Sequence, residues 1–103
     1  MERDEFIRRL AALRENKGVS ARDMSLSLGQ SPGYINNIEN GVNYPSMAVF
    51  FYICDYLQIT PKEFFDTEIA DPGKARELTD AIRGLSSEQI DMLISLAKGL
   101  KRQ

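Results

Sequence analysis

The chain has 103 residues, of which 43% are hydrophobic and 27% are charged, so it can form one small domain with a short accessory segment. It contains no histidine and one cysteine, Cys54, which removes the commonest general base, the commonest metal ligand and any intrachain disulfide. The 13 Lys and Arg against 15 Asp and Glu give a formal net charge of −2, whereas nucleic-acid-binding proteins usually carry a basic surplus.

The charge is unevenly distributed along the chain, because residues 23–61 contain no Lys or Arg. No apolar run approaches the ~18 residues that a bilayer-spanning helix needs. The charged first residues are not followed by the apolar segment of a signal peptide. We therefore expect a cytoplasmic protein that has no membrane partner.

The first part of the chain is predicted to form two short helices. Apolar residues at helical spacing predict an amphipathic helix over residues 4–16, and Gly18 is a typical residue to end it. Ser20 is a favourable N-cap for a second helix, which carries Met24 and Leu28 on one face. Gly29 ends this second helix after about two turns.

A third helix is predicted to begin directly after Gly29. Ser31 is a favourable N-cap, and Pro32 is favoured at the next position because its missing N–H would be unpaired there. Ile35 and Ile38 share one face of this helix, and Gly41 ends it.

The rest of the chain is predicted to form four more helices and no sheet, so the fold class is all-α. Ser46 caps a fourth helix, a capping box at Thr60 opens a fifth, Pro72 opens a sixth and a capping box at Ser86 opens the last. The residues of the fourth helix predicted to face the core are Met47, Phe50, Ile53, Cys54 and Leu57.

The second and third helices, joined by a tight turn at Gly29, fit a helix-turn-helix. The sequence resembles the phage-repressor and Cro-like (Xre-type) helix-turn-helix family over residues 6–66. The segments that carry this resemblance are residues 13–20, 24, 28–29, 31, 34–35, 38–41, 45–46 and 57–65. It implies a five-helix DNA-binding domain over residues 1–66 that acts as a transcriptional regulator, commonly as a dimer. A C-terminal helical hairpin over residues 67–103 would follow as an accessory or dimerisation segment.

The resemblance also implies roles for individual residues. Ser31 would cap the recognition helix and bring its amides near a phosphate. Asn36 and Asn37 would lie on the outward face, where an Asn amide can pair with adenine. Arg14 and Glu39 match an internal ion pair of the family. The residues predicted to contact DNA are Ser20, Arg22, Gln30, Ser31, Pro32, Gly33, Tyr34, Asn36, Asn37, Asn40, Asn43 and Tyr44.

The sequence departs from the family at positions that contact DNA. Ala21 stands where the family often has Gln, and neither Pro32 nor Gly33 can donate a side-chain hydrogen bond to a base. Because residues 23–61 contain no cation, we expect a shallow salt dependence of about two to four phosphate contacts per protomer. Backbone amides at Ser31 and in the loop 41–46 would make those contacts instead.

Several polar residues have two interpretations. Tyr34 could meet a thymine methyl or a phosphate, or could simply cover the turn. Arg22 could meet a phosphate or pair with an acid. Arg3, Arg8 and Arg9 could flank a groove or only solubilise the first helix, and the Asn-rich face could be a solvated surface.

Two apolar faces need a partner. The fourth helix carries apolar or aromatic residues beyond its core face, and the last helix carries the apolar stripe Ile90, Leu93, Ile94, Ala97 and Leu100. Either residues 72–101 fold back onto the fourth helix, or the two faces meet across a dimer. Cys54 is expected to be a buried hydrophobic residue, with a redox sensor as the alternative.

The sequence therefore predicts a sequence-specific DNA-binding regulator. A homodimer would place two recognition helices, about residues 31–40, in successive major grooves of double-stranded DNA. The alternative is a protein-interaction module, adaptor or antitoxin-like, on the same fold. We expect no enzyme activity, metal, cofactor or small-molecule ligand, because no catalytic or ligand-binding motif is present.

Overall fold

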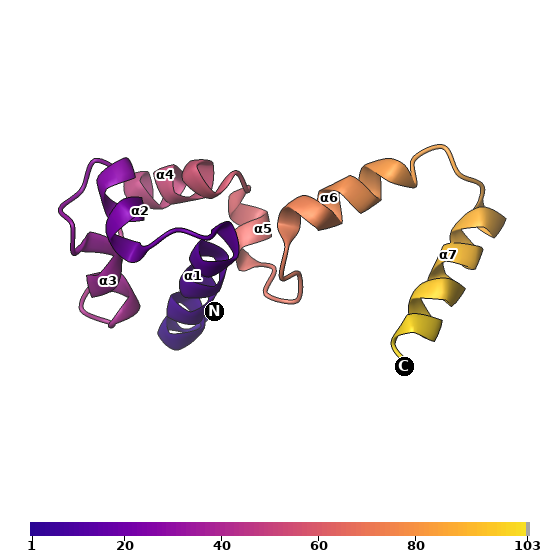
Figure 1. Cartoon of the computed structure of the whole chain (residues 1–103), viewed down its shortest axis with the longest axis horizontal. Coiled ribbons are helices and arrows are strands. Elements are labelled where there is room, and N and C mark those ends of the chain that lie inside the picture. The colour runs from indigo at the N-terminus through magenta and orange to yellow at the C-terminus, as the bar shows by residue number, and fades with distance from the viewer. Residues whose placement is uncertain (103) are drawn as a thin grey trace. The chain divides into compact units, whose positions relative to one another are not determined.

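The computed structural model describes residues 1–102, and every regular element in that range is a helix (Figure 1). The predicted all-α fold class is confirmed, with five helices in the first part of the chain and two after them. No helix among the described residues is long and apolar enough to cross a bilayer. The helices are α1 (Arg3–Lys17), α2 (Ala21–Ser27), α3 (Tyr34–Glu39), α4 (Met47–Leu57), α5 (Pro61–Phe65), α6 (Pro72–Ala81) and α7 (Ser87–Leu100).

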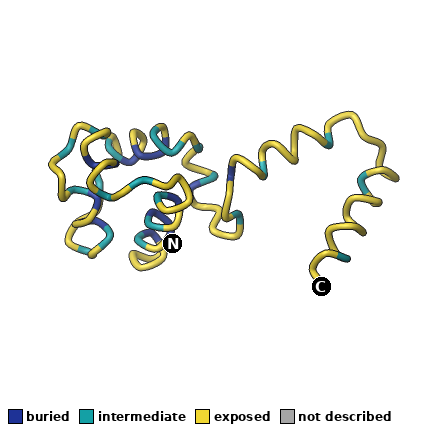
Figure 2. The backbone as a smooth tube through the Cα atoms, viewed as in Figure 1, coloured by how far each residue is buried: buried dark blue, intermediate teal, exposed yellow. Residues whose placement is uncertain are grey.

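The chain divides into two units, Met1–Gly73 and the segment from Lys74 onward. In the first unit, α1 to α5 surround one apolar core, which accounts for most of the buried residues in Figure 2. The buried hydrophobic residues are Phe6, Leu10, Leu13, Met24, Ile35, Ile38, Phe50, Ile53, Cys54 and Phe64.

Most of the predicted core of α4 is correct, but Met47 is not part of it. Phe50, Ile53 and Cys54 are buried and Leu57 packs against them, whereas Met47 is 67% exposed. Met47 is the first residue of α4, one turn before Phe50, which is the first buried residue of this helix.

The predicted helix starts are largely confirmed. Ser20 Oγ accepts a hydrogen bond from the backbone N–H of Asp23 at 3.0 Å, and Ser46 caps α4 in the same way. At the start of α5, the Thr60 and Glu63 side chains each accept a hydrogen bond from the other residue's backbone N–H. These bonds satisfy amides that a helix cannot pair internally.

Arg9 is a structural residue, and both sequence interpretations of it are wrong. Its side chain lies inside the first unit, with 5% of the residue exposed. Nε donates to the carbonyl oxygen of Phe64, Nη2 to that of Glu63 and Nη1 to that of Ile69, at 2.6, 2.8 and 2.9 Å. Arg9 therefore ties the end of α5 and the connector after it to α1.

The second unit consists of the greater part of α6, the turn 82–86 and α7. Gly84 has φ of +85° in this turn, and a capping box between Ser86 and Gln89 opens α7, as predicted. Among the described residues of α7 none is buried, so its apolar stripe is open to solvent.

Candidate nucleic-acid interface

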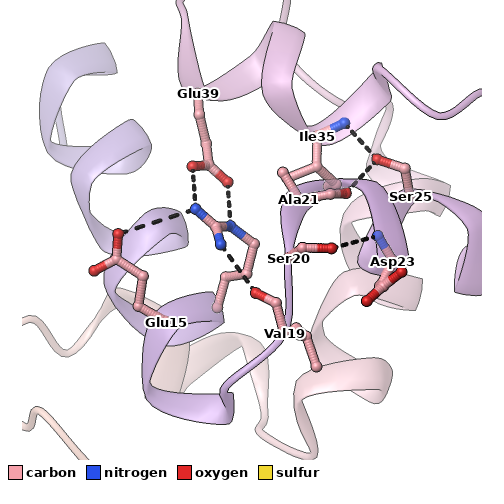
Figure 3. A network of polar contacts seen from close by, with 9 residues as sticks. Glu15, Val19, Ser20, Ala21, Asp23, Ser25, Ile35 and Glu39 are labelled. Carbon is pink, nitrogen blue, oxygen red and sulfur yellow. Dashed lines mark hydrogen bonds and ion pairs between the residues drawn. The ribbon is translucent and has the colours of Figure 1, made fainter.

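A buried serine links α2 to α3 through its hydroxyl. Ser25 lies in the middle of α2 and is fully buried. Its hydroxyl donates to the carbonyl oxygen of Ala21 at 2.7 Å and accepts from the backbone N–H of Ile35 at 3.0 Å (Figure 3). The second bond pairs an amide in the first turn of α3. Sequence reasoning missed Ser25, although a small hydroxyl residue beside buried Met24 is a signal for such a bond.

A bidentate ion pair fixes α3 to α1. Arg14 Nε and Nη2 lie 2.8 and 2.9 Å from the two carboxylate oxygens of Glu39, with only 15% and 14% of the two side chains exposed. Arg14 Nη1 also donates to the carbonyl oxygen of Val19, in the loop before α2 (Figure 3). The hydrogen bond to Glu39 raises the pKa of Arg14. The ion pair that the family resemblance implied is therefore present.

The third helix, α3, begins later than predicted. Its first residue is Tyr34, and its N-cap is Gly33, which makes no side-chain capping bond. The backbone N–H of Tyr34 donates to the carbonyl oxygen of Ser31 at 3.0 Å, so Pro32 and Gly33 form a turn ahead of the helix. The predicted cap by the Ser31 hydroxyl, with Pro32 at the first helical position, is wrong because this turn comes first.

The outward face of α3 is an array of amide side chains. Asn36, Asn37 and Asn40 are exposed, while Ile35 and Ile38 on the other face are fully buried. The predicted DNA-contacting residues that are exposed are Ser20, Arg22, Ser31, Pro32, Gly33, Asn36, Asn37, Asn40, Asn43 and Tyr44.

Tyr34 and Gln30 are only partly exposed. Tyr34 packs against the core, and this burial raises the pKa of its hydroxyl. Partial burial fits the interpretation in which the ring covers the turn, and it leaves part of Tyr34, the first residue of α3, accessible.

The loop after α3 offers fewer amides than expected. The backbone N–H of Gly41 donates to the carbonyl oxygen of Ile38 at 3.0 Å. The backbone N–H of Val42 donates to the backbone carbonyl oxygen of Asn37 at 2.8 Å. Both amides close the end of the helix. The prediction that the amides of the loop 41–46 carry the phosphate contacts is therefore wrong at these two positions.

Tyr44, later in the same loop, is held against α1. Its ring meets Phe6 edge-on with a centroid separation of 5.8 Å, and Arg3 Cζ lies 5.3 Å from the ring centroid. Tyr44 is nevertheless 53% exposed, so about half of its surface remains accessible to solvent.

Cys54 lies away from this face, in the core. It is buried, and burial together with Asp55 raises the pKa of its thiol to about 11. A thiol held protonated in this way is a packing residue and not a nucleophile. Within the described residues, no three acidic or Cys side chains lie close enough together to hold a metal ion.

Comparison with known proteins agrees with this geometry. A family model described as a helix-turn-helix domain matches residues 7–68. The chain belongs to the helix-turn-helix family. The solved SinR protein/SinI protein complex contains a chain of similar fold, with a TM-score of 0.56 and 22% identity over 95% of this chain and 99% of that chain. The search of curated proteins returned no match. The helix-turn-helix part of the predicted resemblance is thus confirmed, and helix-turn-helix domains are typical of DNA-binding proteins.

Proposed function

We propose that the chain is a sequence-specific transcriptional regulator that inserts α3 into the major groove of double-stranded DNA. The observation that carries the proposal is the two-sided character of α3. Ile35 and Ile38 anchor one face in the core, and Asn36, Asn37 and Asn40 present amides on the other. A helix held rigidly from behind can place such groups against base edges without further ordering.

The chemistry of this face favours adenine. An Asn amide donates one hydrogen bond and accepts another, which matches the N7 and N6 groups of adenine in the major groove. Each such bidentate pair discriminates against a wrong base by about 1–3 kcal/mol. The regulator would act by occupying its site and changing the access of polymerase, in the cytoplasm.

We further propose that it binds as a homodimer through residues 67–103. Leaving a large apolar side chain in water forgoes about 1.5–3 kcal/mol. A second copy could cover the exposed stripe of α7 and set two α3 helices about 34 Å apart, one turn of DNA. The stripe is formed by Ile90, Leu93, Ile94, Ala97 and Leu100.

Selection from a pool of randomised DNA duplexes tests the DNA-binding proposal. The wild-type chain should enrich a two-fold symmetric sequence, and the double variant Asn36→Ala/Asn37→Ala should lose preference for it by 10-fold or more, about 1.4 kcal/mol. Asn16→Ala is the matched control, because Asn16 is an exposed amide on α1 and not on α3. An unchanged preference in the double variant would refute readout by α3.

Sedimentation of the wild-type chain tests the dimer. Ile94→Glu should produce a monomer, because it puts a charge in the apolar stripe. Ser95→Glu, the neighbouring residue on the polar face of α7, should leave the dimer intact. A wild-type chain that stays monomeric at every concentration and on DNA would overturn the proposed homodimer.

A second candidate function is a protein-interaction module, adaptor or antitoxin-like. It is favoured by the absence of Lys and Arg in residues 23–61 and by the half-exposed aromatic residues Phe51 and Tyr52 on α4. The similar solved structure is itself a complex of two proteins, SinR and SinI. Failure of the wild-type chain to enrich any duplex at low salt would favour this candidate.

A further inference from the structure

DNA binding requires cations, and the sequence around α3 supplies none. Counterion release by Lys and Arg provides much of the affinity of a protein for DNA. Between Arg22 and Lys62 the chain has no basic residue, and the amides of Gly41 and Val42 are used inside the protein. If α3 enters the major groove, the charge beside it must come from another part of the fold.

The first two turns of α1 bring charge to the end of α3. A guanidinium nitrogen of Arg3 lies 3.8 Å from the position that a Cβ would occupy on Gly41, directly after the recognition helix. Arg8, further along α1, lines the same groove of about 350 Å³, and so does Asn40 of the outward face of α3. Arg3 and Arg8, which are far from α3 in the sequence, thus lie beside the predicted DNA-contacting face.

The guanidinium of Arg3 is oriented by an aromatic ring. It lies over the ring of Tyr44. The Tyr44 ring in turn makes an edge contact with Phe6 in the core, which holds the ring in place. A stacked guanidinium loses less side-chain freedom when it binds an anion, and its planar donors suit two phosphate oxygens.

The two arginines are available to a ligand. Both are exposed, and neither forms an ion pair with any residue between 1 and 102. Two acids line the groove, Asp4 and Glu39, and the charge of Glu39 is already neutralised by its ion pair with Arg14. The two arginines therefore face one uncompensated carboxylate, that of Asp4. The groove therefore carries a net positive charge, which favours the binding of an anion.

We propose that Arg3 and Arg8 form a binding site for the DNA phosphate backbone beside the groove that α3 enters. This inference rests on the proposed function, since it assigns the phosphate contacts of the same interface. Asn36 and Asn37 on α3 select the sequence, while Arg3 and Arg8 on α1 supply charge and set the register of the protein on the duplex.

The test is the salt dependence of affinity for the duplex enriched by the wild-type chain, followed by fluorescence anisotropy. Arg3→Ala should lower the slope of log K against log salt by about 0.9 per protomer, and the double variant Arg3→Ala/Arg8→Ala by about twice that. Arg3→Lys keeps the charge and should keep the slope. Lys62→Ala removes the same charge from α5 of the same unit and should leave the slope unchanged.

The effect should be uniform across sequences, because a phosphate contact carries no base information. The ratio of affinities for the enriched and a scrambled duplex should therefore survive in Arg3→Ala and fall only in Asn36→Ala/Asn37→Ala. Thermal unfolding of each variant shows that the fold is retained.

Two outcomes separate the failure of this site from the failure of the proposed function. If the wild-type chain binds its selected duplex but Arg3→Ala and the double variant keep the wild-type slope, the arginine site is wrong and readout by α3 stands. A slope that falls as far in Arg3→Lys, or in Lys62→Ala, as in Arg3→Ala would also overturn the site. If the wild-type chain selects no duplex, both proposals fall together.

Discussion

The two units of the chain start their helices in the same way and differ in what covers those helices. Ser20 caps α2 and Ser86 caps α7 with hydrogen bonds of 3.0 and 3.1 Å to a backbone N–H three residues later. In the first unit the helices bury ten hydrophobic residues against one another, whereas in the second α7 buries none. Local signals thus suffice to specify a helix, but burial depends on what the rest of the chain provides.

The difference has a thermodynamic meaning. An isolated helix of about 14 residues is marginal in water, and most helix stability comes from packing an apolar face. The first unit should therefore unfold as one cooperative body, and α7 should owe its stability to a partner.

The largest expected difference is between two leucine truncations. Leu10 is fully buried in α1, so Leu10→Ala should lower the free energy of unfolding by about 2–5 kcal/mol. Leu96 in α7 is exposed, and Leu96→Ala in the monomeric chain should change it by less than about 0.5 kcal/mol. Chemical denaturation followed by tyrosine fluorescence measures both, and equal losses would show that α7 belongs to the first folding unit.

Thiol chemistry offers the next largest contrast. Burial raises the pKa of Cys54 from 9.0 to about 11, which lowers its thiolate fraction at pH 8 by about 100-fold. Cys54 should therefore react with a disulfide reagent at least that much more slowly than a Cys placed by Ser95→Cys in a Cys54→Ser background.

The same shift has a consequence for stability at high pH. The unfolded chain ionises its thiol first, so the stability that Cys54 contributes is complete below pH 9 and is lost as the pH rises towards 11. Denaturation midpoints of the wild type should fall more steeply over this window than those of Cys54→Ala. Parallel curves would contradict burial of the thiol.

Arg9 should contribute more to the free energy of unfolding than its neighbour Arg8. Arg9→Met removes a donor from three carbonyl oxygens, of which that of Glu63 keeps the backbone N–H of Asp66, and should cost about 1–3 kcal/mol of unfolding free energy. Arg8→Met, one residue along α1, removes the same charge from an exposed position and should cost less than about 0.5 kcal/mol. Denaturant titration of the pair measures the difference, and similar values would show that the bonds of Arg9 contribute little.

The smallest expected effect compares the two serine caps. Ser20→Ala should lower the unfolding free energy of the first unit by about 1 kcal/mol. Ser86→Ala removes an equivalent bond but should only reduce the helix content of α7, since no packed core is coupled to it. Far-ultraviolet circular dichroism and denaturation distinguish the two results. A cooperative loss of stability in Ser86→Ala would place α7 in a packed structure.

Helix positions were predictable because their signals are local. The caps at Ser20, Ser46, Thr60 and Ser86 each act within three residues, and the core residues of α1 follow from helical spacing. The start of α3 was not predictable in this way. Ser31 and Pro32 favour a cap and a first turn, yet the backbone bond between Ser31 and Tyr34 closes a separate turn there.

Long-range contacts of arginines on α1 were the least predictable, apart from the ion pair between Arg14 and Glu39 that the family resemblance implied. Arg9 bonds to carbonyl oxygens 54 to 60 residues away, and carbonyl oxygens leave no mark on a sequence. Its place on the apolar stripe of α1, between Phe6 and Leu13, was the one available signal. The approach of Arg3 to Gly41 likewise depends on how α1 lies against α3 and not on any local motif.

The partners of Arg9 also have an evolutionary consequence. Because it binds main-chain oxygens, which every residue type carries, Ile69 of the connector can be replaced without removing an acceptor of Arg9. Arg9 itself has no equivalent substitute, since no other side chain presents five donors in a planar fork. Mutation of the connector should thus be tolerated while its path along α1 is inherited unchanged, so new C-terminal segments could be joined to this helix-turn-helix unit at a constant point.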